Sequence, residues 1–337
     1  FALFQPLFFP QFHGNKGDLM KRFILASLAA VALVVPQAVF AADAPVLLST
    51  AVVPDVALKL ASNSDIANSV ADDQGVLLGG LGSDLYHIPG DAADIFYAIT
   101  DRGPNNDTVQ PDKSAGTGFV VPTFSPLILK VQISGSQVKI LETIAIKTKT
   151  GVGVTGLPNI KGYDAVPTDV KGITADSMYN LAGQDAEGIV KTANGDFWIV
   201  DEYAPSLAQL SSTGVIKARY VPAGWKGNPT TFKAVKSIPS LYLTRKANRG
   251  FEALALSPDG KTLFIGLQSP LLNPTKAIGD ASLATRILRF DLGSKSFTGE
   301  FVFGFEKVSL VDAKATKNSD LKLSAMVALD SNTLLVQ

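Results

Sequence analysis

The sequence predicts an all-β protein of the propeller class. Short apolar runs rich in β-branched and aromatic residues recur along the chain, and clusters of Gly, Asp, Asn and Pro separate them. A unit of strand, tight turn and strand also recurs at matched places, and two such units in succession make a four-stranded propeller blade. A β-sandwich or a domain of two separate sheets is the alternative.

The chain is expected to begin with segments that are not part of this fold. Met20, Lys21 and Arg22 precede an uncharged apolar run at 23–35, and Ala41 offers a small residue for cleavage. This layout is typical of a secretory signal peptide, and the run is short for a membrane span. We therefore expect an upstream non-native leader at 1–19, a signal peptide at 20–41, and an exported chain, periplasmic or secreted, from about residue 42. An uncleaved anchor or a buried helix is the alternative.

The composition of the exported part excludes several kinds of function. The whole chain has 30 basic and 30 acidic residues, and removing the first 41 residues leaves a net charge near −2. A nucleic-acid partner is not expected, because such proteins usually carry a basic surplus. Without cysteine, and with His87 as the one histidine after the signal peptide, thiol chemistry and multi-histidine metal sites are excluded. The chemistry must use carboxylates, hydroxyls, amides and guanidinium groups.

Hairpin turns define the repeat. Asn194-Gly195 and Asp259-Gly260 stand between apolar runs, and both dipeptides favour the positive φ angles of tight turns. A third turn lies at 330–332, and an earlier, looser copy runs from 76 to 101. The paired runs are 187–190 with 197–200, 252–256 with 263–267, and 325–329 with 333–336.

Each complete copy is followed by a second pair of strand-like runs. These runs are 127–133 and 138–146, 207–210 and 215–221, and 286–292 and 297–303. Residues 147–184, rich in Gly, Thr and Asp, form an expected insertion between blades. The last copy ends in mid-strand at Gln337, and a propeller must close to hide its edge strands. We therefore expect one β-propeller domain over 42–337 that is incomplete at its C-terminus.

Polar residues occupy equivalent places in the repeat. Asp101, Asp201 and Gln268 each end a strand, and the inner strands of a propeller bring such ends to one mouth of the channel. Other acids open the neighbouring strands. The expected carboxylates of this mouth are Asp101, Asp185, Glu187, Asp201, Glu202 and Glu252.

Grouped carboxylates need a positive partner. Ca²⁺ is the natural one, since it takes six to eight oxygen ligands. Arg102, Arg249 and Arg286 could instead neutralise the acids or bind a phosphate. A single Asp at a strand end is also a common turn residue, whereas Glu187 and Glu252 stand inside apolar strands and need a partner there.

Five segments taken in order resemble the bacterial phytase-like family, the "esterase-like activity of phytase" domain. They are 101–105 (Asp-Arg-Gly-Pro-Asn), 185–189, 197–203, 248–255 and 268–271. The resemblance runs from about Val76 to the C-terminus. It implies an exported propeller that hydrolyses phosphate esters with the six acids named above, and it implies a further acidic, arginine-containing stretch beyond Gln337.

These observations lead to a hypothesis of a metal-dependent phosphoesterase that acts on a small-molecule ester. The expected catalytic residues are Asp101, Glu187, Asp201 and Glu252. The expected substrate-binding residues are Arg102, Asn105, Asn248, Arg249 and Gln268. The expected Ca²⁺ ligands are Asp185, Glu187, Asp201, Glu202 and Glu252. A non-catalytic calcium-stabilised binding module and a lactonase or carboxylic-ester hydrolase remain as alternatives.

Overall fold

The computed structural model describes residues 2–4, 47, 49–59, 76–78, 81–311 and 316–337. The chain divides into two units, Phe1–Pro6 with Ala51–Gln337, and Leu7–Thr50. The expected signal peptide at 20–41 lies outside the described residues, as does most of the expected leader. The account below concerns the first unit.

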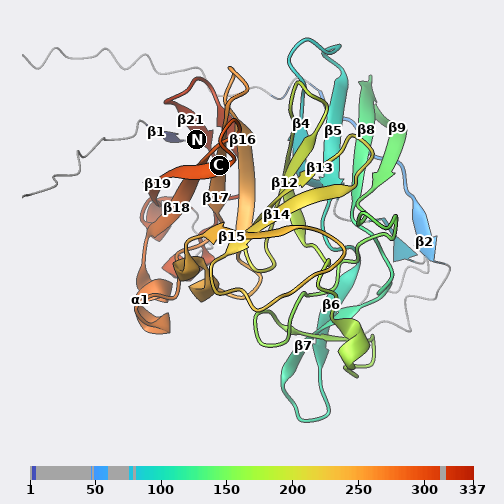
Figure 1. Ribbon diagram of the computed structural model, residues 1–337, viewed down its shortest axis with the longest axis vertical. Helices are drawn as coiled ribbons and strands as arrows, with labels where there is room; N and C mark the ends of the chain where they lie inside the picture. The colour runs from blue at the N-terminus through green and yellow to red at the C-terminus, as the bar shows by residue number, and fades with distance from the viewer. Residues whose placement is uncertain (1, 5–46, 48, 60–75, 79–80, 312–315) are drawn as a thin grey trace, which may run out of the picture. The chain divides into compact units, whose positions relative to one another are not determined.

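Consecutive strands form the blades and pair antiparallel except for β14 and β15, which are parallel, and this arrangement confirms the all-β propeller prediction (Figure 1). The first blade consists of β4 (Leu81–Tyr86), β5 (Ile95–Thr100), β8 (Leu127–Ser134) and β9 (Gln137–Ala145). The second consists of β11 (Ala186–Lys191), β12 (Phe197–Asp201), β13 (Ser206–Leu210), β14 (Ile216–Pro222) and β15 (Ala234–Ile238). The third consists of β16 (Phe251–Leu256), β17 (Thr262–Leu267), β18 (Ala284–Asp291) and β19 (Ser296–Gly304). A shorter sheet follows with β20 (Met326–Ala328) and β21 (Leu334–Val336).

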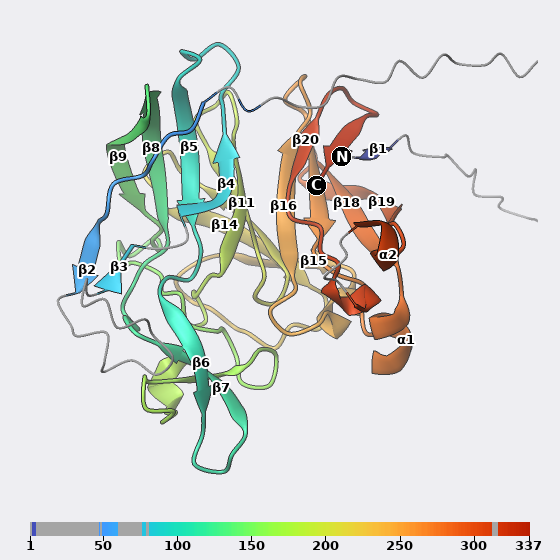
Figure 2. The same ribbon diagram turned by 180° about the vertical axis from the view of Figure 1, so that it is seen from behind.

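The first strand of each sheet lies innermost. Strand β11 lies between β4 and β16, and β16 lies beside β20 (Figure 2). The Ile189 amide of β11 donates to Asp84 Oδ2 of β4 at 2.8 Å, which links two blades by a hydrogen bond. Strands β11 and β16, which carry Glu187 and Glu252, are therefore direct neighbours.

The hydrophobic core lies between successive blades. Side chains alternate along a strand, so β12 buries both faces: Phe197 and Ile199 join the core shared with the first blade. Trp198 and Val200 join the core shared with the third blade. The near-continuous apolar run at 197–200 is therefore the signature of a strand covered on both sides.

The predicted hairpin turns are present. Gly195 and Gly260 have φ angles of 87° and 69°, in the left-handed region that glycine enters without a Cβ penalty. The Gly195 amide donates to the Thr192 carbonyl at 2.9 Å. These turns explain why the paired runs predicted from the sequence match β11–β12 and β16–β17.

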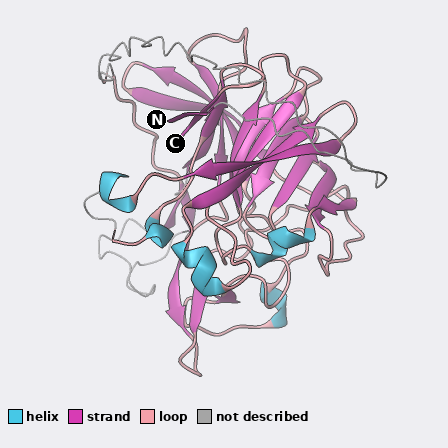
Figure 3. Cartoon of the chain, turned by 90° about the vertical axis from the view of Figure 1, so that its left-hand side faces the viewer, coloured by secondary structure: helices cyan, strands magenta, loops and turns pink. Residues whose placement is uncertain are grey.

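Several elements were not predicted. Strands β6 (Asn105–Val109) and β7 (Ala115–Phe119) form a hairpin that pairs with β10 (Val166–Thr168) from the expected insertion. Strand β1 (Ala2–Phe4), inside the expected leader, pairs with β21, and β2 (Ala57–Lys59) pairs with β3 (Val76–Leu77). Short helices lie in the connections (Figure 3), namely η2 (Asp176–Met178), η3 (Ser240–Thr244), α1 (Lys276–Ala281), α2 (Val308–Val311) and η4 (Asn318–Asp320).

Candidate functional site

The expected mouth is formed where β12 and β17 end and where β11 and β16 begin. Antiparallel pairing sets the end of one strand beside the start of the next, so Asp201 pairs with Ala186 in the register of β11 and β12. The Glu202 amide donates to the Asp185 carbonyl at 3.0 Å. In the third blade the Gln268 amide donates to the Gly250 carbonyl at 2.9 Å. The acids of two blades therefore meet at one end of the inner strands.

Three carboxylates form a tight group. Asp185, Glu187 and Glu202 each have an oxygen within 4.8 Å of the others. Asp185 and Glu202 are each 2% exposed, whereas Glu187 also lines a pocket of about 570 Å³ together with Glu252. The group is therefore mostly buried, and it borders space that a small molecule can enter.

The surroundings of these carboxyl groups disfavour their charged form. Burial, followed by the neighbouring carboxylates, raises the pKa values of Glu187 and Glu202 well above the usual range. Burial also raises the pKa of Glu252 to about 7 and that of Asp101 to about 6. Each of these groups loses solvation and gains like-charged neighbours, so the cluster requires protons or cations.

Gly250 allows the third blade to approach the acids. A Cβ atom on Gly250 would lie 2.2 Å from the Glu202 carbonyl oxygen and 2.4 Å from the Glu202 Cα atom. Because these are backbone atoms, they cannot move aside easily. The glycine of the Arg-Gly-Phe-Glu sequence at 249–252 therefore lets the start of β16 lie against the Glu202 backbone. The charge of Glu252 is among the effects that raise the pKa of Glu202.

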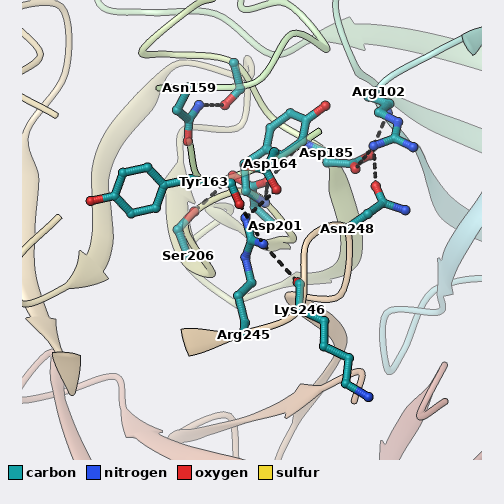
Figure 4. Close-up of polar contacts among 12 residues, drawn as sticks. Arg102, Asn159, Tyr163, Asp164, Asp185, Asp201, Ser206, Arg245, Lys246 and Asn248 are labelled. Carbon is teal, nitrogen blue, oxygen red and sulfur yellow. Dashed lines mark hydrogen bonds and ion pairs between the residues drawn. The ribbon is translucent and has the colours of Figure 1, made fainter. Parts of the chain in front are cut away.

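Arg102 is the cation beside the group (Figure 4). Its Nη1 donates to Asp185 Oδ2 at 2.9 Å and to Asn248 Oδ1, and its backbone amide donates to Asp185 Oδ1 at 3.3 Å. Nη2 donates to Asn105 Oδ1 at 3.4 Å. Burial opposes the charge on this guanidinium, but Asp185 and its other neighbours outweigh burial and raise its pKa. Arg102 thus pairs with Asp185 at the edge of the acidic group.

Asp101 stands at the edge of the group. Its Oδ1 accepts a hydrogen bond from the Gly103 amide at 2.7 Å, and its neighbour Arg102 contacts Asp185. The carboxylate is half-buried, and Asp185 contributes to its raised pKa. Asp101 is therefore a candidate proton acceptor near the three-carboxylate group.

Asp201 has a different environment from the other acids. Oδ1 accepts from the amides of Asp185 and Tyr203, each at 2.9 Å. Oδ2 accepts from Ser206 Oγ at 3.0 Å and from Arg219. Four donors occupy the lone pairs of a carboxylate that is 0% exposed. We assign Asp201 to the scaffold that holds Asp185 and Tyr203, rather than to substrate or cation binding.

Sequence reasoning missed two arginines that form buried ion pairs. Arg219 contacts Asp201, and its Nη1 donates to the Gly183 carbonyl at 3.0 Å. Arg245 pairs with Asp164, which lies in the insertion at 147–184 (Figure 4). A charged residue inside the apolar run 215–221 was a signal for a buried partner at Arg219. No signal in the sequence pairs Asp164 with Arg245.

The remaining expected residues lie around the group with varied partners. Gln268 Nε2 donates to Glu252 Oε2 at 2.6 Å. Arg249 donates to Ser269 Oγ at 3.2 Å. Arg286, considered as a counter-charge, pairs with Glu300 at 2.5 Å within the third blade. Gln268 therefore belongs to the acidic group, and Arg249 contacts the loop after β17. Arg286 is paired with Glu300 and does not contact the group.

The donor set fits a hard cation. Glu202 Oε1 and Gln268 Oε1 are buried and have no hydrogen-bond partner among the described residues. A buried oxygen without a donor is costly, and Ca²⁺ binds carboxylate and amide oxygens of this kind. The residues present therefore suit Ca²⁺ better than a metal that requires nitrogen or sulfur ligands.

The blades and their acidic mouth define a β-propeller with a carboxylate-lined site. The chain belongs to the phytase-like family, described as esterase-like activity of phytase, whose model matches residues 76–337. This span contains every acid of the mouth.

The relatives described next share little sequence identity with this chain. An "uncharacterized secreted protein" of Arthroderma benhamiae is 26% identical over 285 residues, which cover 70% of this chain and 54% of the relative. The chain thus spans about half the length of that relative. A luciferin-regenerating enzyme gives a TM-score of 0.33 at 12% identity, covering 77% of this chain and 69% of its own. The Dos1 propeller gives 0.29 at 9% identity, covering 77% and 51%. None of the helices in the described part of the chain has the length and apolar character of a membrane crossing.

Proposed function

We propose that the chain is a Ca²⁺-dependent phosphoesterase that acts on small-molecule phosphate esters. The observation that carries this proposal is the buried group of Asp185, Glu187 and Glu202, whose oxygens lie within 4.8 Å of one another. Membership of the phytase-like family supports the same reaction class. Arg102 pairs with Asp185, and the charges of Arg245 and Lys322 act on Glu202 and Glu252. These cations are fewer than the acids, so a bound metal ion would relieve the remaining repulsion.

The four acids Asp185, Glu187, Glu202 and Glu252 hold the cation in this proposal. A bound Ca²⁺ would attract the substrate phosphate and make a nearby water more acidic. The protein supplies the enclosed position of the acids, since burial strengthens their interaction with a cation compared with water. Asp201 and Arg219 keep Asp185 in place through its backbone amide.

Asp101 acts as the proton acceptor in this proposal. Its pKa of about 6 leaves it mostly ionised at neutral pH, which suits a general base. The water oxygen bonds to phosphorus, its proton passes to Asp101, and the ester P–O bond breaks. The alcohol oxygen that leaves then takes up the proton. Arg102, supported by Asn105 and Asn248, is positioned to offset charge that develops on the phosphate oxygens.

A carboxylic-ester or lactone substrate is the second candidate. Arg102 also donates to Asp185 and Asn248, so an anionic substrate would share this guanidinium with Asp185. A neutral ester carbonyl would need no such cation. The same acids and the same proton acceptor would serve its hydrolysis.

The test measures product release from three substrates: phytate, bis(p-nitrophenyl) phosphate and a γ-lactone, each with Ca²⁺ and with EGTA. We expect Ca²⁺-dependent phosphate-ester cleavage that falls at least ~100-fold in Glu187→Gln. Glu142→Gln, an exposed glutamate on β9, is the matched control and should keep full activity. Turnover of the lactone alone would select the second candidate. Binding of Ca²⁺ without any turnover would contradict both and favour a binding module.

We further propose that the protein is exported to the periplasm or the medium after cleavage near Ala41. The apolar run at 23–35 and the secreted relative support this location. N-terminal sequencing of the protein recovered from cell fractions tests it. A mature terminus near Ala42 in an exported fraction is expected, and uncleaved protein in the cytoplasm would contradict it.

A further inference from the structure

Arg102 lies on the loop that follows β5, and two other segments pack closely against the backbone of this loop. A Cβ atom on Gly156 would lie 1.8 Å from the Arg102 carbonyl oxygen and 2.7 Å from the Arg102 Cα atom. A Cβ atom on Gly103 would lie 2.3 Å from Cδ1 of the Phe124 ring. The two glycines therefore allow neighbouring segments to fix the loop that carries the guanidinium.

Hydrogen bonds hold Gly156, a residue of the insertion at 147–184, between two blades. Its amide donates to the carbonyl of Phe124 at 3.1 Å, shortly before β8 of the first blade. Its carbonyl accepts from Tyr203 Oη at 2.8 Å, and Tyr203 follows the end of β12 in the second blade. Both polar groups of the Gly156 backbone are thus bonded, one toward each blade.

The Tyr203 side chain is closed off from solvent. It is 1% exposed, and its hydroxyl is used in the bond to Gly156. The Tyr203 amide donates to Asp201 Oδ1 at 2.9 Å, which ties this tyrosine to the acid of the scaffold. A hydroxyl fixed in this way can set the position of the Gly156 segment without touching a ligand.

The contacts of Arg102 depend on where its loop lies. Its backbone amide and its Nη1 donate to the two carboxylate oxygens of Asp185, at 3.3 Å and 2.9 Å (Figure 4). The main chain and the guanidinium must therefore both be placed correctly to reach one carboxylate. A displacement of about 1 Å at a group that acts on substrate can cost up to about 100-fold in rate, so a small shift of this loop would matter.

We propose that Tyr203 is a positioning residue whose hydroxyl, through the Gly156 carbonyl, keeps the loop of Arg102 in the place from which the guanidinium meets the phosphate. This inference rests on the proposed function, in which Arg102 offsets charge that develops on the phosphate oxygens. Because that interaction strengthens as the charge develops, its loss lowers kcat more than it raises KM. The insertion that carries Gly156 thereby takes part in the site without supplying a ligand.

Tyr203→Phe removes the hydroxyl alone and is the variant that tests this role. With bis(p-nitrophenyl) phosphate and saturating Ca²⁺, we expect kcat to fall about 10-fold with little change in KM. In an Arg102→Met background the same substitution should leave the residual kcat nearly unchanged, because the group that it positions is gone. Tyr242→Phe is the matched control and should keep full activity. Tyr242 is also fully buried, and its hydroxyl donates to Glu300 Oε1 at 2.9 Å.

Phenylglyoxal, which modifies accessible guanidinium groups, reports the position of Arg102 without any turnover. Mass spectrometry of peptides should show several-fold faster modification of Arg102 in Tyr203→Phe but not in Tyr242→Phe, with Arg289 on β18 as the internal reference. Circular dichroism checks that the variants fold. Unchanged reactivity of Arg102, or an equal fall in kcat in the Arg102→Met background, would overturn the proposal. If the unsubstituted chain does not cleave the diester, the proposed function fails, and faster modification of Arg102 in Tyr203→Phe would still support the positioning role.

Discussion

Asp201 and Glu202 are consecutive residues at the end of β12, and both are almost completely buried, yet their carboxylates have opposite surroundings. Asp201 accepts four hydrogen bonds, one of them from the guanidinium of Arg219. Glu202 lies among other acids, and its Oε1 has no partner among the described residues. Asp201 is the last residue of β12 and Glu202 begins the turn after it, so the carboxylate of Asp201 lies within the blade and that of Glu202 joins the acidic group.

This difference shows which property separates a scaffold acid from a site acid. Burial raises the pKa of both, to about 6 for Asp201 and well above the usual range for Glu202. Arg219 and two backbone amides oppose the rise at Asp201, whereas Asp185 and Glu252 add to it at Glu202. A buried carboxylate that lacks a compensating donor is therefore the better indicator of function.

The largest expected effect comes from removing the partner of Asp201. Arg219→Met leaves Asp201 charged and buried, which typically costs about 3–5 kcal/mol of the free energy of unfolding. Urea unfolding in EGTA measures this loss. Lys217→Met on the same strand is the control, and it should cost less than about 1 kcal/mol because Lys217 is half exposed. Equal losses in the two variants would remove the special role of the Asp201 pair.

A smaller effect is expected where the third blade approaches Glu202. Gly250→Ala forces a Cβ atom against the Glu202 backbone, so we expect a loss of about 1–3 kcal/mol and weaker Ca²⁺ binding. Gly304→Ala is the control, since a Cβ atom there meets no atom within 4 Å. Unfolding and Ca²⁺ titration would be measured on both. Unchanged Ca²⁺ affinity in Gly250→Ala would show that the close approach does not shape the site.

The smallest effect concerns Asp84, a half-buried acid whose hydrogen bonds come from the backbone amides of Leu85 and Ile189. Burial raises its pKa from 3.8 to about 6. Its protonated form thus stabilises the fold fully below about pH 4, and this stability is lost as the pH rises through about 6.

Asp84→Asn removes that pH dependence. Relative to the unsubstituted chain, the variant should gain about 2 kcal/mol in free energy of unfolding between pH 4 and pH 8. Urea unfolding at both pH values measures the gain. A constant difference between the two proteins would show that Asp84 keeps an ordinary pKa in the fold.

The blades could be predicted from the sequence because their signals are local. The run at 197–200 and the glycine turn before it specify a two-sided buried strand and its hairpin without knowledge of the rest of the chain. The elements in the insertion carry no such pattern, and β10 forms a strand only because β7 is beside it.

The division of the acids into scaffold and site could not be predicted. Asp201 and Glu202 look equivalent in sequence, and their difference depends on Arg219, which lies 18 positions away on another strand. Arg245 reaches Asp164 across 81 positions. Such pairs depend on tertiary packing. The repeat pattern could therefore predict that the acids meet at one mouth, but it could not show which of them an arginine already neutralises.

The most direct test of this account compares Asp201→Asn with Glu202→Gln by thermal unfolding in EGTA and in Ca²⁺. In EGTA, Asp201→Asn should unfold at a lower temperature than the unsubstituted chain, and Glu202→Gln at an equal or higher one. Added Ca²⁺ should raise the unfolding temperature of the unsubstituted chain and of Asp201→Asn, but not that of Glu202→Gln. A full Ca²⁺ response in Glu202→Gln, or a loss in EGTA as large as that of Asp201→Asn, would contradict the account.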